Sequence, residues 1–127
     1  MATRVLLVED SRATRAYVGA ILEANDIEVD EVDNGFEALR VLPRERYDLI
    51  VADVNMPDVN GIELTRFVRR TPTHATVPIL VISTDGAEAD VRRALAAGAT
   101  AFLPKPFTAE QLLDAIAQLR ASAGEDP

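Results

Sequence analysis

Residues 49–53 read Leu-Ile-Val-Ala-Asp, a run of four apolar residues that ends in an acid. Residues 5–8 (Val-Leu-Leu-Val) and 79–82 (Ile-Leu-Val-Ile) are two more runs of four, and a polar residue also follows each of them. An unbroken apolar run of this length predicts a strand buried on both faces, which is typical of the central strands of a parallel sheet. The three runs therefore predict a parallel sheet with residues 49–53 in its interior.

Weaker patterns complete an alternation of strands and helices. Residues 27–32 mix apolar and acidic side chains and residues 101–103 are a short apolar run, which predicts two strands at the sheet edges. Helical periodicity separates the strands, and Ser11 is a candidate N-cap. The apolar stripes of the expected helices are Thr14, Tyr17, Val18, Ile21 and Leu22, then Phe36 and Leu39, then Leu64, Phe67 and Val68, then Val91, Ala94 and Leu95, then Leu112, Leu113 and Ile116.

This alternation predicts an α/β protein with a doubly wound five-stranded parallel sheet. The flavodoxin-like strand order 2-1-3-4-5, built from five βα units, places the two half-polar strands at the edges. Residues 1–120 are expected to form this one domain, and residues 121–127 a flexible C-terminal tail.

The composition excludes several classes of function. The 127 residues include 21 acidic and 13 basic side chains, and the resulting charge of −8 does not suit binding to nucleic acid or to an anionic membrane. The absence of cysteine excludes disulfides and cysteine-ligated metals. No apolar run is long enough for a secretory signal or a membrane span, so the protein is expected in the cytoplasm.

Side chains capable of chemistry follow the predicted strands, at the edge where a doubly wound sheet binds its ligands. They are Glu9, Asp10, Asp53, Ser83 and Lys105. Two carboxylates about 5 Å apart repel each other by roughly 3 kcal/mol at an effective dielectric constant near 20, so three together favour a bound divalent cation. Oxygen ligands without His or Cys favour Mg²⁺, with Mn²⁺ or Ca²⁺ as alternatives. Asp53 is the best candidate for a nucleophile toward a phosphoryl group.

Four motifs occur in the order and at the spacing of a known family. They are Glu9-Asp10, Asp53 within Asp-Val-Asn-Met-Pro-Asp followed by Gly61, Ser83 after Pro-Ile-Leu-Val-Ile, and Lys105-Pro106-Phe107. Over about residues 4–120 the chain thereby resembles the receiver domain of two-component response regulators, in particular the single-domain regulators of the chemotaxis type.

The resemblance implies a role in phosphorelay signal transduction. Asp53 would accept a phosphoryl group from a sensor histidine kinase or a histidine phosphotransfer protein, and the protein would catalyse only its own phosphorylation and dephosphorylation. Mg²⁺ would be the cofactor, held directly by Asp10, Asp53 and the backbone carbonyl of Asn55, and by Glu9 largely through water.

The resemblance also implies how the phosphorylated state is recognised. Ser83 and Lys105 would each bind a phosphoryl oxygen, and the bond from Lys105 to Pro106 would be cis. Phe102 would act with Ser83 as the switch that changes the face formed by the fourth helix, the fifth strand and the fifth helix, where a downstream protein target would bind. Thr84 stands where the family prefers Ala or Gly, and its branched side chain is expected to narrow access to the phosphoryl group.

Other interpretations remain open at the level of the sequence. The chain is either a complete single-domain regulator, which Met1 and the short tail favour, or a receiver module of a larger regulator or hybrid histidine kinase. An aspartate-nucleophile phosphatase is a distant alternative, because Asn55 stands where that class needs an acid. A flavodoxin is disfavoured, because Glu9-Asp10 would repel the phosphate of the flavin. His74 is expected to be a solvated loop residue outside the site.

Overall fold

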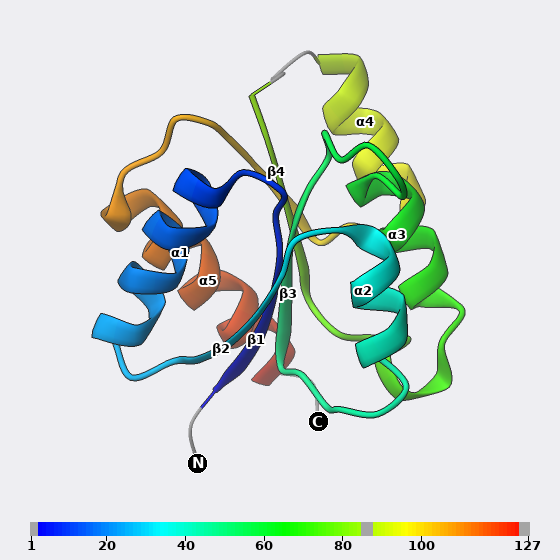
Figure 1. The fold of residues 1–127 in the computed structure, drawn as a ribbon, viewed down its shortest axis with the longest axis horizontal. Helices are drawn as coiled ribbons and strands as arrows, with labels where there is room; N and C mark the ends of the chain where they lie inside the picture. Colours follow the sequence, from blue (N-terminus) through cyan, green and yellow to red (C-terminus); the bar gives the residue numbers. More distant parts are fainter. Residues whose placement is uncertain (1–2, 85–87, 125–127) are drawn as a thin grey trace.

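The computed structural model describes residues 3–84 and 88–124, and it confirms the predicted sheet. Five parallel strands lie in the order β2-β1-β3-β4-β5 (Figure 1). They are β1 (Arg4–Val8), β2 (Glu28–Val32), β3 (Leu49–Asp53), β4 (Ile79–Ser83) and β5 (Ala101–Pro104).

Helices cover both faces of the sheet. They are α1 (Arg12–Ala24), α2 (Gly35–Val41), α3 (Gly61–Arg69), the short 3-10 helix η1 (Pro72–His74), α4 (Glu88–Ala97) and α5 (Ala109–Gly124). Figure 1 shows α1 and α5 on one face and α2, α3 and α4 on the other. Alternate strand residues accordingly enter two separate cores: Val5 and Leu7 pack on the α1 and α5 side, whereas Leu6 and Val8 pack on the other.

Polar caps begin the first three helices. Ser11 is the N-cap of α1, as predicted, and its hydroxyl accepts a hydrogen bond from the Thr14 N–H at 3.3 Å. Asn34 caps α2, and Asn60 forms a capping box with Glu63 at the start of α3. These caps fix where each helix starts after the loop that leaves the preceding strand.

Several large apolar side chains of the predicted stripes face outward, which the periodicity did not anticipate. The exposed fractions are 46% for Tyr17, 60% for Phe36, 41% for Phe67 and 46% for Leu95. On α2 and α4 the small residues Ala38 and Ala94 are the buried contacts instead. A short helix that packs closely through alanine leaves the larger neighbours on its stripe at the rim of the core.

Two further predictions were wrong. The tail was expected from residue 121, but α5 continues to Gly124, because residues 117–124 are mostly good helix formers and Leu119 packs in the core. Residues 125–127 lie outside the described residues.

His74 is 2% exposed rather than solvated: its Nε2 accepts the Tyr47 N–H at 3.3 Å, and its Nδ1 lies 2.9 Å from the Thr73 hydroxyl.

Within the described residues, no helix combines the length and the apolar character needed to cross a bilayer.

Candidate functional site

Three carboxylates meet where β1 and β3 end. The register pairs Val8 with Ala52, so the residues that follow these two strands leave the sheet at the same level. One oxygen from each of Glu9, Asp10 and Asp53 lies within 4.8 Å of the others. Glu9 is fully buried and Asp53 is 2% exposed, whereas Asp10 is open to solvent. The predicted convergence of these three acids is therefore confirmed.

Lys105 supplies the positive charge of the site. Its Nζ donates to Glu9 Oε1 at 2.6 Å and lies 3.5 Å from Asp53 Oδ1, so in this structure the ammonium is closer to Glu9 than to Asp53. The Lys105–Pro106 peptide bond is cis, as the resemblance implied. The Lys105 N–H donates to the Ser83 carbonyl at 2.8 Å, which ties the end of β5 to the end of β4.

Both carboxylate oxygens of Glu9 already accept hydrogen bonds. Oε1 accepts from Lys105, and Oε2 accepts the Ser11 N–H at 3.0 Å. The Arg15 guanidinium donates to the Glu9 carbonyl at 2.8 Å. The Glu9 side chain is therefore held in place at the base of the site.

The surroundings of Asp10 disfavour its charged form. Desolvation by its surroundings raises the pKa of Asp10, although the residue as a whole is exposed, and a hydrogen bond and the charge of neighbouring Glu9 raise it further. Lys105 acts in the opposite direction but is outweighed. A carboxyl group whose charge is disfavoured in this way gains from a nearby cation.

Asn55 connects the loop after β3 to the end of β4. Its N–H donates to Asp53 Oδ1 at 3.3 Å. Its side-chain amide donates to the Ser83 hydroxyl at 3.1 Å and to the Thr84 hydroxyl at 3.4 Å. Ser83 is fully buried and Thr84 is exposed, so Thr84 stands at the rim of the site and Ser83 inside it.

The loop from Asp53 to α3 is held by two features. A Cβ on Gly61 would lie 2.5 Å from the Asp53 carbonyl oxygen, so only glycine allows α3 to start this close to the end of β3. The carboxylate of Asp58 accepts the N–H groups of Gly35 and Phe36 at 3.2 and 3.0 Å, which fastens the loop to the start of α2. Desolvation opposes the charge of Asp58, but these backbone hydrogen bonds prevail and lower its pKa.

The sequence offered no signal for the role of Asp58, because its partners are more than twenty residues away.

Phe102 lies apart from the acidic cluster. It pairs with Val81 across the β4–β5 ladder, two residues before the level of Ser83. Its ring is partly buried against the core on the side of α2, α3 and α4. The predicted switch pair of Ser83 and Phe102 therefore occupies neighbouring strands.

Among the residues that the structure describes, Glu9, Asp10 and Asp53 form the single carboxylate group close enough to hold an ion. Glu28, Asp30 and Glu31 lie on β2, at the edge of the sheet.

Comparison with known proteins identifies the family. A model of the response regulator receiver domain matches residues 5–117. The chain belongs to the response regulator receiver family. The resemblance inferred from the four motifs is thus confirmed. The accepting of a phosphoryl group within two-component signalling is the general role of receiver domains.

This receiver domain is similar to proteins from several bacteria. The response regulator MprA of Mycobacterium leprae is 39% identical over 124 residues, which cover 97% of this chain and 54% of that protein. The chemotaxis protein CheY4 of Vibrio cholerae has a TM-score of 0.90 and 34% identity, over 94% of this chain and 99% of that one.

A third relative carries a metal. The receiver domain of the sensor histidine kinase PA1611 from Pseudomonas aeruginosa PAO1, described with a magnesium ion coordinated in the active site cleft, has a TM-score of 0.88 and 29% identity. That comparison covers 95% of this chain and 99% of the other. The chain spans about half the length of MprA and between 13% and 55% of the curated relatives compared.

Proposed function

We propose that this receiver domain accepts a phosphoryl group on Asp53 in a Mg²⁺-dependent reaction and thereby changes a protein-binding face. The observation that carries the proposal is the convergence of Glu9, Asp10 and Asp53 within 4.8 Å, with the Lys105 ammonium against two of them. The donor of the phosphoryl group would be a phosphohistidine on a sensor histidine kinase or a histidine phosphotransfer protein.

The acidic cluster fits Mg²⁺ by its chemistry. All its donor atoms are carboxylate oxygens, which this cation prefers, and no His or Cys lies among them. Asp10 and Asp53 would hold the ion directly, together with the backbone carbonyl of Asn55. Glu9 would act largely through water, because both its oxygens already accept hydrogen bonds from protein groups. Bound Mg²⁺ would offset the charge of the carboxylates and of the incoming phosphoryl group.

Asp53 is placed to act as the nucleophile. One of its carboxylate oxygens would attack the phosphorus, forming an O–P bond as the P–N bond to the imidazole breaks and the electron pair stays on the nitrogen. Lys105 lies 3.5 Å from Asp53 Oδ1 and would pair with one phosphoryl oxygen. The Ser83 hydroxyl would donate to another. The Ser83 oxygen accepts a hydrogen bond from the Asn55 amide, which does not use the hydroxyl hydrogen.

The signal would pass from Ser83 to Phe102. Movement of Ser83 toward the phosphoryl group leaves space on the core side of β4, and the Phe102 ring on β5 is already partly buried beside it. Further inward rotation of this ring would alter the face made by α4, β5 and α5, where a downstream protein target would bind. Full burial of an aromatic ring is worth roughly 2–3 kcal/mol, so the remaining gain is smaller and the switch is graded.

The uptake of phosphate tests this proposal. Intact-mass spectrometry after incubation with acetyl phosphate should show a phosphoryl adduct on the wild-type protein when Mg²⁺ is present. EDTA should abolish the adduct, and so should the substitution Asp53→Asn. A conservative Asp58→Asn variant serves as the control, because it removes a carboxylate from the same loop outside the cluster. An adduct on Asp53→Asn at wild-type yield would overturn the proposal.

A further inference from the structure

The outer side of β2 is a free sheet edge. Among the residues that the structure describes, β2 pairs with β1 alone. The Glu28 N–H donates to the Thr3 carbonyl at 2.8 Å, and the Val32 carbonyl accepts the Glu9 N–H at 3.1 Å, so these residues turn their backbone groups toward β1. Backbone groups alternate in direction along a strand. The N–H and C=O groups of Val29 and Glu31 therefore point away from the sheet.

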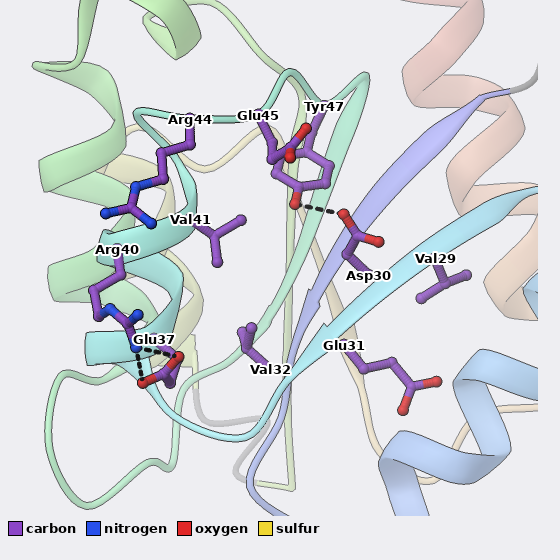
Figure 2. Close-up of a pocket in the computed structure, with 10 residues that line it drawn as sticks. All are labelled: Val29, Asp30, Glu31, Val32, Glu37, Arg40, Val41, Arg44, Glu45 and Tyr47. Atoms are coloured by element: carbon purple, nitrogen blue, oxygen red, sulfur yellow. Dashed lines mark hydrogen bonds and ion pairs between the residues drawn. The ribbon is translucent and has the colours of Figure 1, made fainter.

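A cleft runs along this edge. It has a volume of about 580 Å³ and lies between β2 and α2 (Figure 2). Figure 2 shows Val32 and Val41 directed into the space between the two elements and Glu31 directed to the opposite side, toward α1. Two further clefts, of about 880 and 380 Å³, lie toward the two ends of β2. Each is lined by fewer β2 residues than the first cleft. An extended segment has room beside β2.

The edge is strongly acidic. Eight different carboxylates and four arginines line the three clefts. Three of these arginines, Arg4, Arg15 and Arg40, already pair with carboxylates of the protein itself. The edge thus keeps an excess of four negative charges, half of the net charge of the whole chain.

This charge selects the kind of partner. A second copy of the chain would place the same acids opposite one another across the new strand pair, and like charges directly opposite destabilise a sheet. A segment with Lys or Arg at alternate positions would instead place all its cations on one face of the sheet, beside Glu28 and Asp30 or, turned over, beside Glu31. Acidic side chains at an edge also prevent aggregation, because they repel most other strands. They do not repel a strand that carries basic side chains.

We infer that the β2 edge binds an extended Lys- or Arg-bearing segment of a partner protein as a sixth strand. The partner would hydrogen-bond the outward groups of Val29 and Glu31, and its basic side chains would pair with the surrounding carboxylates. The clefts along this edge are lined by none of Glu9, Asp10, Asp53 and Lys105, so the inference does not depend on the proposed function. The Asp53→Asn variant is expected to bind the same segment equally well.

A capped seven-residue peptide of alternating Lys and Val, added to the isotope-labelled full chain, tests the inference by NMR. We expect the amide signals of Val29 and Glu31 to shift, and their hydrogen exchange to slow at least tenfold at saturation. Binding should weaken about tenfold or more from 50 to 300 mM NaCl, since the charges are exposed to solvent. A peptide with Glu in place of Lys should not bind.

Two comparisons separate strand addition from simple charge attraction. The same peptide with N-methyl groups at alternate residues keeps its charge but cannot pair along one side, so its binding should be at least tenfold weaker. The double substitution Glu28→Lys with Glu31→Lys should abolish binding. The matched pair Glu110→Lys with Asp114→Lys, on the exposed side of α5, should retain affinity within twofold.

Three results would overturn the inference. They are equal binding by the N-methylated peptide, amide shifts that leave out Val29 and Glu31, and a protein that forms a dimer through β2. Sedimentation at increasing protein concentration, with Val29→Pro as the variant that removes an outward N–H, detects the dimer. The peptide comparisons use the wild-type protein, so they remain decisive if a charge-reversed variant fails to fold.

Discussion

Substitution of Lys105 by methionine removes the cation that lies against the buried Glu9 carboxylate, while keeping most of the side-chain volume. The pair is short, at 2.6 Å, and shielded from water, with the Lys105 side chain 12% exposed and that of Glu9 fully buried. Loss of one partner from a buried ion pair costs about 3–5 kcal/mol, because the other charge is left without compensation. We expect a loss of about 3 kcal/mol when no divalent metal is present.

This loss has a measurable size. For a domain of this length, about 1 kcal/mol corresponds to roughly 3–5 °C in melting temperature, so Lys105→Met should melt about 10–15 °C lower in EDTA. Arg40→Met is the control, because its pair with Glu37 is exposed on α2 and worth about 1 kcal/mol or less. Thermal melts followed by circular dichroism measure both.

Mg²⁺ should repair much of the damage. At about ten times its dissociation constant, a ligand that binds only the folded state stabilises it by about 1.4 kcal/mol. Without the competing ammonium the carboxylates should bind Mg²⁺ more tightly, so the rise in melting temperature on adding 10 mM MgCl₂ should be larger for Lys105→Met than for wild type. An equal loss of melting temperature in EDTA and in Mg²⁺, or a loss no larger than that of Arg40→Met, would refute this role of Lys105.

Three further predictions concern other parts of the molecule. Burial, followed by the charge of Arg46, lowers the pKa of His74 below its usual 6.5. The neutral imidazole therefore contributes its full stabilisation of the folded state above about pH 6.5, and this contribution is lost as the pH falls. Urea midpoints should therefore drop between pH 7.5 and 5 more for wild type than for His74→Gln, and equal drops would contradict this. Asp58→Ala should lower stability by about 1 kcal/mol, measured by urea unfolding, because two N–H groups of α2 lose their acceptor. An unchanged midpoint would exclude that role. Phe102→Ala should leave the uptake of phosphate from acetyl phosphate within about twofold of wild type, measured by intact mass. It should reduce the NMR shifts that beryllofluoride induces in residues 88–104. Shifts as large as those of wild type would show that Phe102 is not part of the switch.

The sequence predicted the fold because its strongest pattern is also its most local one. Four apolar residues in a row leave no polar face, so the runs at residues 5–8, 49–52 and 79–82 have to be strands covered on both sides. The acids and the hydroxyl that follow these runs converge because parallel strands end at one edge of the sheet. The proximity of Asp53 to Asp10 thus follows from the strand topology.

The remaining features depend on packing between distant segments. His74 looks like a loop residue in sequence, but η1 turns its ring against Tyr47, 27 residues away. Periodicity placed Phe36 inside, yet the close approach of α2 through Ala38 leaves it exposed. The preference of Lys105 for Glu9 over Asp53 depends on distances of 2.6 and 3.5 Å that spacing along the chain does not encode.

The most direct test of the central claim locates the phosphoryl group itself. The protein is treated with acetyl phosphate and Mg²⁺, reduced with borohydride, which converts an aspartyl phosphate to homoserine, and digested for peptide mass spectrometry. Homoserine is expected at position 53 alone, and none is expected when EDTA replaces Mg²⁺. Conversion at Asp10 with Asp53 intact, or conversion at Asp53 that is undiminished in EDTA, would contradict it.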